Sequence, residues 1–238
     1  MRVLVLGATG ATGSLVVKQL INRNVEVKAV IRKDNGVLKD FENHKLLECV
    51  VGNISEFDLN KNIELINDCD AVVCCLGHNI SFKGLFGKPR MLVSDSIKNI
   101  CKAIAESKKD KVKLILMNTT GNMNRKIREN YSFRDRIVLS LLNILLPPQK
   151  DNVEAARYLS NNIGENNSKI EWIAVRPDTL INEEKESDYE IFESPKRSPV
   201  FDAGKTSRIN VGYFMSELIT NANIWEKWKF KMPVIYNK

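Results

Sequence analysis

The chain has 238 residues, 43% of them hydrophobic and 27% charged, which is the composition of an ordinary globular protein with one large domain. The longest apolar run, residues 137–146, has about half the length needed to span a bilayer. Lysine and arginine exceed the acidic residues by 36 to 29, but they are dispersed and no aromatic–basic motif accompanies them, so an anionic small ligand is favoured over nucleic acid.

Strand and helix patterns alternate through most of the chain. Apolar or alternating runs predict strands at 2–6, 25–31, 46–51, 71–76, 112–117 and 170–175. Helical spacing of the apolar residues predicts helices at 14–21, 93–105 and 152–161, and residues 63–67 are expected to end a further short helix. Alternation of this kind implies right-handed βαβ units and therefore a parallel, doubly wound α/β sheet.

The last part of the chain continues the same domain. A polar, charged stretch at 182–208 precedes a predicted helix at 211–220 and a last strand at 231–236. Without a repeat, a low-complexity tract or a linker, the sequence predicts a single domain over 1–238 with a mainly parallel sheet of six to seven strands. Residues from about 178 to 238 would supply a substrate-side loop, the last helix and the last strand.

The cysteines indicate a reducing compartment. Cys49, Cys69, Cys74, Cys75 and Cys101 lie in apolar or helical segments and form no Cys-x-x-Cys pair, which is typical of buried thiols without a disulfide framework or a metal site. The first residues form a strand pattern rather than a basic segment followed by an apolar one, so no secretion signal is expected. A cytoplasmic location without membrane attachment is the expectation.

Three glycines, Gly7, Gly10 and Gly13, occupy the turn GATGATG between the first predicted strand and helix. Gly7 permits the tight turn, Gly10 lets a pyrophosphate approach the backbone, and Gly13 lets the helix pack closely. The helix N-terminus then offers N–H groups and a positive dipole end to phosphates.

The residues between these glycines complete the predicted phosphate-binding loop. Thr9 and Thr12 offer hydroxyls to phosphate oxygens, and Ala11 lies between Gly10 and Thr12. A triple-glycine pattern alone is weak, but the strand before it and the helix after it are the context that a dinucleotide site requires. We therefore predict dinucleotide binding at this corner; a glycine-rich turn without a ligand is the alternative.

The end of the second predicted strand indicates which dinucleotide is bound. Sites that prefer NAD place Asp or Glu there, whereas this strand is followed by Arg32 and Lys33, with Asp34 beyond them. A guanidinium pairs with a 2′-phosphate and stacks on adenine. NADP(H) is therefore preferred over NAD(H), and two solvated surface cations are the alternative.

These motifs together resemble the atypical short-chain dehydrogenases/reductases, closest to the NmrA-like NAD(P)H-binding group and similar to biliverdin reductase B, a flavin reductase. The resemblance implies a doubly wound Rossmann fold and covers nearly the whole chain. It rests on GATGATG, VIRKD, VVGNISE, DAVVCCLGHN, KLILMNTTG, IEWIAVRPDTL and TSRINVGYFMSELI.

The resemblance assigns further positions to the cofactor. It places Asn53 and Ile54 beside adenine, although the family usually has Asp where Asn53 stands. His78 would be a phosphate contact or a proton donor, with ordinary polar surface as the alternative. The loop before it would line the ribose and pyrophosphate through Cys75, Leu76 and Gly77.

The expected reaction site departs from the family pattern. Thr119 falls where the family places its active-site Ser or Thr, and Pro177 would abut the nicotinamide. No tyrosine is followed four positions later by lysine, so the usual Tyr-x-x-x-Lys pair is missing. Lys150 and Glu154 match the family's K-x-x-x-E, which puts Leu146 in the place of the tyrosine. Lys150 is expected to bind ribose hydroxyls beside catalytic Thr119; an exposed helix-start lysine is the alternative.

Without the tyrosine, reduction of an ordinary ketone lacks its proton donor. A small aromatic or quinoid acceptor, such as a flavin, a quinone or a conjugated tetrapyrrole, takes a hydride without it. Met123, Tyr131 and Phe133 would offer a surface for such a ring, and the run 137–146 is expected to be core rather than a dimer contact. The sequence therefore predicts an NADP(H)-dependent reductase of flavin-like or quinone-like acceptors.

Two other functions remain open. A non-catalytic NADP(H)-binding redox sensor of the NmrA type, acting through a protein partner, fits the missing tyrosine equally well. An epimerase or dehydratase of nucleotide sugars shares the glycine motif but normally keeps the Tyr–Lys pair and has a larger substrate domain.

Overall fold

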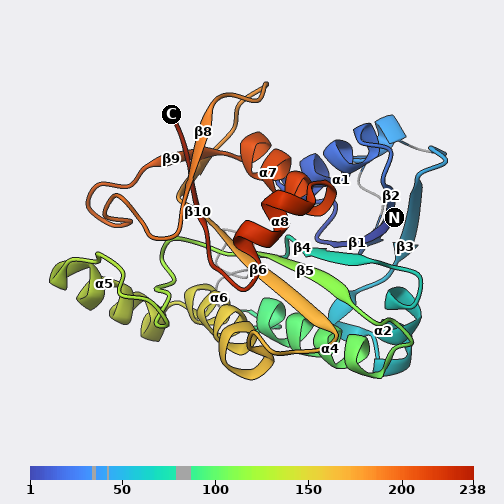
Figure 1. The fold of residues 1–238 in the computed structure, drawn as a ribbon, viewed down its shortest axis with the longest axis horizontal. Helices are drawn as coiled ribbons and strands as arrows, with labels where there is room; N and C mark the ends of the chain where they lie inside the picture. The colour runs from blue at the N-terminus through green and yellow to red at the C-terminus, as the bar shows by residue number, and fades with distance from the viewer. Residues whose placement is uncertain (34–35, 42, 79–86) are drawn as a thin grey trace.

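The computed structural model describes residues 1–33, 36–41, 43–78 and 87–238 (Figure 1). Asp34, which follows the expected 2′-phosphate contact, lies outside the described residues. The strands in these ranges are β1 (Arg2–Leu6), β2 (Glu26–Ile31), β3 (Leu47–Val51), β4 (Ala71–Cys74), β5 (Val112–Met117), β6 (Ile170–Pro177), β7 (Thr179–Ile181), β8 (Tyr189–Phe192), β9 (Lys205–Ser207) and β10 (Val234–Asn237).

The helices separate most of these strands. The α-helices in the described ranges are α1 (Gly13–Asn22), α2 (Leu59–Ile66), α4 (Leu92–Glu106), α5 (Phe133–Leu145), α6 (Pro147–Arg157), α7 (Arg208–Thr220) and α8 (Ala222–Trp228). Short turns are η1 (Lys39–Phe41), η2 (Ile54–Glu56) and the π-helical η3 (Tyr158–Ile163), which extends α6. None of these helices is long and apolar enough to cross a membrane.

The large sheet of the described chain has eight strands in the order β3-β2-β1-β4-β5-β6-β10-β8, and β7 and β9 form a separate pair. Every pair in the large sheet is parallel except β10 with β8. The doubly wound α/β prediction is confirmed. The strand beyond the predicted six to seven is β8, which lies within the stretch predicted as a polar loop because its sequence YEIF is short and flanked by charged residues.

Helices cover both faces of this sheet (Figure 1). α1, α7 and α8 pack on one face, and α2, α4 and α6 pack on the other. Successive side chains of β1 point to opposite faces of the sheet. Val3 and Val5 belong to the hydrophobic core on one face, whereas Leu4 and Leu6 belong to the core on the other. The strand that carries the glycine corner is therefore fixed from both sides.

α5 lies at the edge of the molecule, and its position corrects the prediction that the run 137–146 is core (Figure 1). Only Asp135 and Leu139 of this helix are buried, and Phe133 and Ile144 are 78% and 76% exposed. Its exposed large apolar side chains are Phe133, Ile137, Leu141, Ile144 and Leu145. The sequence run is apolar on several helical faces, so its pattern could not indicate which face, if any, would be covered.

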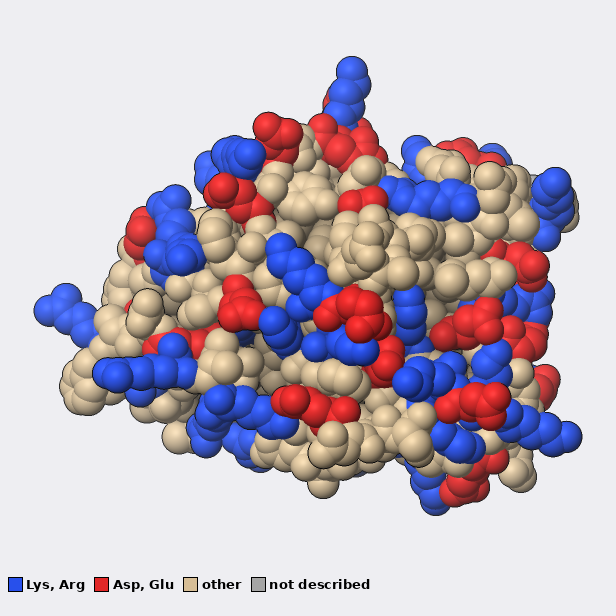
Figure 2. All heavy atoms as spheres, viewed as in Figure 1, with Lys and Arg blue, Asp and Glu red and all other residues tan. Residues whose placement is uncertain are grey.

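Charges of both signs are interspersed over the face drawn in Figure 2. This distribution agrees with the dispersed lysines and arginines of the sequence. Most charged side chains lie at the surface, and the main exception is Arg176, a fully buried residue near the end of β6.

Arg176 joins four segments around one guanidinium. It pairs with the buried carboxylate of Glu129, at 2.6 Å and 3.2 Å. It also donates to the backbone carbonyls of Met232 at 2.8 Å, Asn122 at 2.9 Å and Glu193 at 3.1 Å. These contacts satisfy all the donors of the guanidinium, which is the condition for burying a charged group.

Replacing Arg176 by Met should destabilise the protein by about 3–5 kcal/mol, because it leaves the Glu129 carboxylate buried without a partner. The free energy of unfolding from denaturant titration measures this loss. Arg197→Met is the matched control, since Arg197 pairs with exposed Asp202 at the surface and its loss should leave stability nearly unchanged. Equal losses of unfolding free energy in Arg176→Met and Arg197→Met would contradict a special contribution of the buried Arg176–Glu129 pair to stability.

Candidate functional site

The turn between β1 and α1 leaves no room for side chains at two of its glycines. Gly7 has a φ of +75°, and a Cβ there would lie 2.7 Å from the carbonyl oxygen of Cys75. A Cβ on Gly13 would lie 2.1 Å from the carbonyl oxygen of Gly7. Gly10 is exposed, and a Cβ there would approach only that same oxygen, at 3.1 Å. The turn is therefore tight on its inner side and open at Gly10.

The first turn of α1 presents unpaired donors beside this corner. The backbone N–H groups of Ala11, Thr12 and Gly13 donate to no acceptor in the described part of the chain. Ser14 already donates to the carbonyl of Gly10, at 3.0 Å. Free N–H groups at a helix N-terminus, together with the helix dipole, attract phosphate groups. α1 has no acidic residue in its first turn to compete for them.

A cavity of about 390 Å³ opens at the carboxyl ends of β1 to β4. β1 lies between β2 and β4, so this is the point where the chain's path through the sheet reverses and where doubly wound sheets bind ligands. The predicted site residues that line it are Gly7, Thr9, Gly10, Arg32, Asn53, Ile54, Cys75, Leu76, Gly77 and His78. Sequence reasoning missed the further lining residues Leu6, Val30, Gly52, Gly87, Lys88, Pro89 and Leu92.

The other predicted site residues do not line this cavity, and they fall into two groups by position. Near the corner, Thr12 and Gly13 are buried in the start of α1, while Ala11 and Lys33 are exposed outside the lining. Farther along the sheet are Thr119 after β5, Lys150 in α6 and Pro177 at the end of β6.

Arg32 and Asn53 stand at the side of the cavity formed by β2 and β3. Arg32 follows β2 directly, is exposed and lines the cavity. Asn53 caps η2: its Oδ1 accepts from the hydroxyl of Ser55 at 2.9 Å, and its Nδ2 donates to Glu56 at 2.7 Å. The side chain of Asn53 is therefore engaged locally before any ligand approaches, which the sequence could not indicate.

His78 is held by a buried carboxylate that the sequence analysis did not single out. Its Nε2 lies 2.8 Å from Oδ2 of Asp151, which has no exposed surface. The same carboxylate accepts from the backbone N–H groups of Val93 and Ser94, both at 2.8 Å, in the first turn of α4. Asp151 thereby links α6, α4 and a wall of the cavity.

Two further contacts fasten the first half of α6 to the end of β5. Nδ2 of Asn118 donates to the carbonyl of Asn152 at 2.9 Å, and Nε2 of Gln149 donates to the carbonyl of Gly121 at 2.8 Å. With Asp151, they fix the turn that carries Lys150, whose own side chain is exposed.

The hydroxyl of Thr119 can donate a hydrogen bond to a ligand. Its Oγ1 accepts from the backbone N–H of Gly121 at 3.1 Å, and in the described part of the chain that hydroxyl donates to no acceptor. A hydroxyl whose lone pair is engaged in this way can direct its proton toward a ligand.

The position that the family resemblance assigns to the tyrosine is Leu146. Leu146 is the junction at which α5 ends and α6 begins. Tyr131 is buried and its hydroxyl donates to the carbonyl of Thr120 at 2.6 Å, and burial raises the pKa of Tyr131 far above its ordinary value. The predicted stacking of a flat ring on Tyr131 is therefore not available.

The cysteines differ in exposure. Burial raises the pKa of Cys69, Cys74 and Cys101 to about 12, and it also raises the pKa of Cys75. Cys49 corrects the prediction of five buried thiols, because β3 is an edge strand and exposes it. No cluster of three or more metal-ligating side chains occurs in the described ranges.

Gly13→Ala should destabilise the protein by at least about 1–3 kcal/mol, because its Cβ would lie 2.1 Å from a backbone oxygen that cannot move freely. Thermal or denaturant unfolding measures the loss. Gly77→Ala is the matched control: Gly77 is exposed, and no described atom lies within 4 Å of its would-be Cβ. A Gly13→Ala protein as stable as Gly77→Ala would contradict the tight corner.

Solved structures of other proteins share this fold over most or all of their length. A candidate NADH-flavin reductase from Streptococcus pneumoniae is 15% identical, with a TM-score of 0.66 over 100% of both chains. An anaerobillin reductase from Escherichia coli is 13% identical, with a TM-score of 0.67 over 100% of this chain and 97% of that one. A short-chain dehydrogenase/reductase from Veillonella parvula, solved with NADP, is 15% identical, with a TM-score of 0.66 over 99% of this chain and 94% of that one.

Sequence similarity gives the family. An uncharacterized chloroplastic protein of Arabidopsis thaliana is 35% identical over 82 residues, which are 34% of this chain and 29% of that protein. The profile of a family described as NAD(P)H-binding matches residues 7–222, from the glycine corner to the start of α8. Because this match covers most of the chain, the protein belongs to the NAD(P)H-binding family.

Proposed function

We propose that this chain is an NADP(H)-dependent reductase that passes a hydride to a flavin-like or quinone-like acceptor without a Tyr-x-x-x-Lys pair. The observation that carries the proposal is the cavity at the ends of β1 to β4, where the glycine corner and Arg32 line one space. Membership of the NAD(P)H-binding family supports the cofactor class. The shared fold with proteins described as flavin and anaerobillin reductases supports the acceptor class.

The residues around the glycine corner fit a dinucleotide. The open side of Gly10 and the free N–H groups of the first turn of α1 suit a pyrophosphate. Arg32 and Lys88 add cations to a cavity whose described lining contains no Asp or Glu. The planar guanidinium of Arg32 matches the geometry of a 2′-phosphate, which favours NADP(H). Bound there, the reduced cofactor supplies the hydride.

Thr119, Lys150 and Pro177 are assigned to the nicotinamide side. They follow β5, start α6 and end β6, which are the next elements along the sheet from the cavity. The hydroxyl proton of Thr119 is directed to the acceptor or to the carboxamide. Lys150 binds the ribose hydroxyls from an anchored helix turn. The task left to the protein is to hold donor and acceptor atoms roughly 3–3.5 Å apart.

His78 is assigned to the phosphates or to proton delivery. The ring lines the cavity, and the contact of its Nε2 with the buried carboxylate of Asp151 orients it. A reduced quinoid acceptor needs one proton with the hydride, which His78 or solvent supplies. The proposed reaction therefore does not require the tyrosine of the Tyr-x-x-x-Lys pair.

The alternative function is a non-catalytic NADP(H)-binding redox sensor. The exposed apolar side chains of α5 favour this alternative, because such a surface suits contact with a protein partner. Sustained NADPH oxidation with an acceptor supports the reductase. Tight NADPH binding without turnover across flavins and quinones supports the sensor.

The preference for NADPH should depend on Arg32. We expect NADPH to bind at least tenfold more tightly than NADH, and Arg32→Ala to remove that difference, because a charge-assisted hydrogen bond contributes about 1.5–3 kcal/mol. Thermal shift suffices as readout, since a ligand at 100 times its dissociation constant adds about 2.7 kcal/mol of stability. Lys33→Ala is the matched control, because Lys33 is exposed next to Arg32 but does not line the cavity. Equal binding of the two nucleotides would refute the 2′-phosphate assignment.

Turnover should depend on the hydroxyl of Thr119. Thr119→Val keeps the shape of the side chain but removes the donor, so we expect kcat for NADPH oxidation with a flavin or quinone acceptor to fall roughly tenfold or more. NADPH affinity should change little. Thr220→Val, at the end of α7 on the far side of the sheet, is the control. An unchanged kcat in Thr119→Val would remove Thr119 from the reaction.

A further inference from the structure

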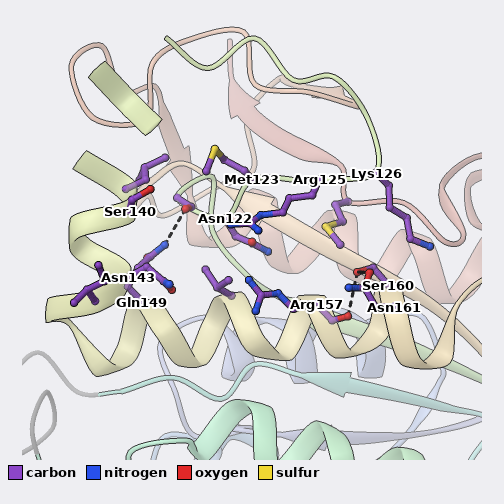
Figure 3. A pocket seen from close by; sticks show the side chains of 15 residues that line it. Asn122, Met123, Arg125, Lys126, Ser140, Asn143, Gln149, Arg157, Ser160 and Asn161 are labelled. Carbon is purple, nitrogen blue, oxygen red and sulfur yellow. Dashed lines mark hydrogen bonds between the residues drawn. The ribbon is translucent and has the colours of Figure 1, made fainter. Parts of the chain in front are cut away.

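A second cavity, of about 210 Å³, lies along α6 (Figure 3). Its walls are α6 and η3 on one side, the loop 121–126 on another and the inner side of α5 at one end. None of its lining residues lines the dinucleotide cavity. The two cavities are therefore distinct spaces, and the proposed cofactor binding assigns no role to the second cavity.

The lining of this second cavity combines an apolar body with polar ends. Its apolar members come from every wall and are Met123, Leu139, Ile144, Val153 and Met232. Amides and hydroxyls stand beside them, among them Gln149 and Ser140 (Figure 3). A lining of this kind binds a ligand that has both an apolar part and a polar group.

The charges of the lining are all positive. They are Arg125, Lys126 and Arg157, and the described lining contains no Asp or Glu. Arg157 donates to Glu154 at 2.8 Å, and Lys126 lies 3.8 Å from Glu165.

Arg125 has no ion-pair partner among the described residues and is exposed at the mouth of the cavity. One guanidinium is thus unneutralised there. A carboxylate matches its fork of N–H groups.

Two buried amide atoms on the wall also lack partners. Nδ2 of Asn122 and Oδ1 of Asn143 are buried without a hydrogen bond in the described structure. Leaving such groups unsatisfied costs about 1–3 kcal/mol each, so they are uncommon in native proteins. The backbone of Asn122 is fixed, because its carbonyl accepts from Arg176 and its N–H donates to Thr119. Only rotation of the side-chain amide can satisfy it, and the cavity is the space beside it.

From these observations we propose that the second cavity binds a small amphipathic carboxylate, an apolar or aromatic body with a single anionic group. The carboxylate lies at Arg125, with the amide of Asn122 within reach after rotation, and the apolar body lies against Met123, Val153 and Met232. The volume admits one ring with a short chain and is smaller than the usual site for a drug-sized ligand. The cavity ends at Gly121 and Gln149, so the ligand lies next to the turn that carries Thr119.

Calorimetric titration of the whole chain with 3-phenylpropionate, in the absence of nucleotide, tests this site. We expect saturable binding of the acid, and binding at least tenfold weaker for the neutral 3-phenylpropanamide. Arg125→Ala should weaken binding of the acid about tenfold. Arg128→Ala, an exposed arginine of the same loop outside this cavity, should leave it unchanged. Val153→Phe, which fills the cavity, should abolish binding in a protein shown by thermal unfolding to be folded.

Several results would overturn the proposal. These are no saturable binding, equal binding of the acid and the amide, or equal effects of Arg125→Ala and Arg128→Ala. Loss of acid binding in Arg32→Ala, or its displacement by NADP⁺ in a competitive manner, would place the acid in the dinucleotide cavity instead. Because the titration contains no nucleotide and measures no turnover, its outcome is independent of the proposed reductase function.

Discussion

The buried guanidinium of Arg176 is the contact on which one whole side of the molecule depends. All its donors are used, and they reach residues 122–129, 193 and 232, which are far apart along the chain. The loop after β5 and the residue that leads into β10 are therefore held in one place. This contact helps to fix the wall of the second cavity formed by Asn122 and Met232, and it acts together with the contacts of Gln149 and Tyr131 on the turn after Thr119.

α6 contacts elements at both cavities. On one side, Asp151 reaches His78 and the start of α4; on the other, Gln149 reaches Gly121. A carboxylate without exposed surface is tolerable here because it accepts two backbone N–H groups and a ring nitrogen. The same first turns of α6 thus line the second cavity and hold His78, which lines the dinucleotide cavity.

The sequence predicts the parts of the site whose chemistry is local. The turn GATGATG, the position of Arg32 after β2 and the buried strands are each visible within a few residues. The long-range side-chain contacts are different: His78 and Asp151 are 73 positions apart, and Glu129 and Arg176 are 47 apart. No periodicity links such residues, because only the folded sheet brings them together. The edge strand β8 and the exposed side of α5 were missed for the related reason that short or uniformly apolar segments do not reveal their neighbours.

Leu146, the position that the family resemblance assigns to the tyrosine, has a distinctive structural context. In this chain the position is not inside a continuous helix but at the junction of α5 and α6, followed by Pro147 and Pro148. Tyr131 cannot take over, because its buried hydroxyl already donates to the carbonyl of Thr120 and its raised pKa makes it a weaker acid. In the proposed reductase, His78, Thr119 or solvent would deliver the proton, which suits the proposed acceptors because their reduced form is a stabilised anion rather than a simple alkoxide.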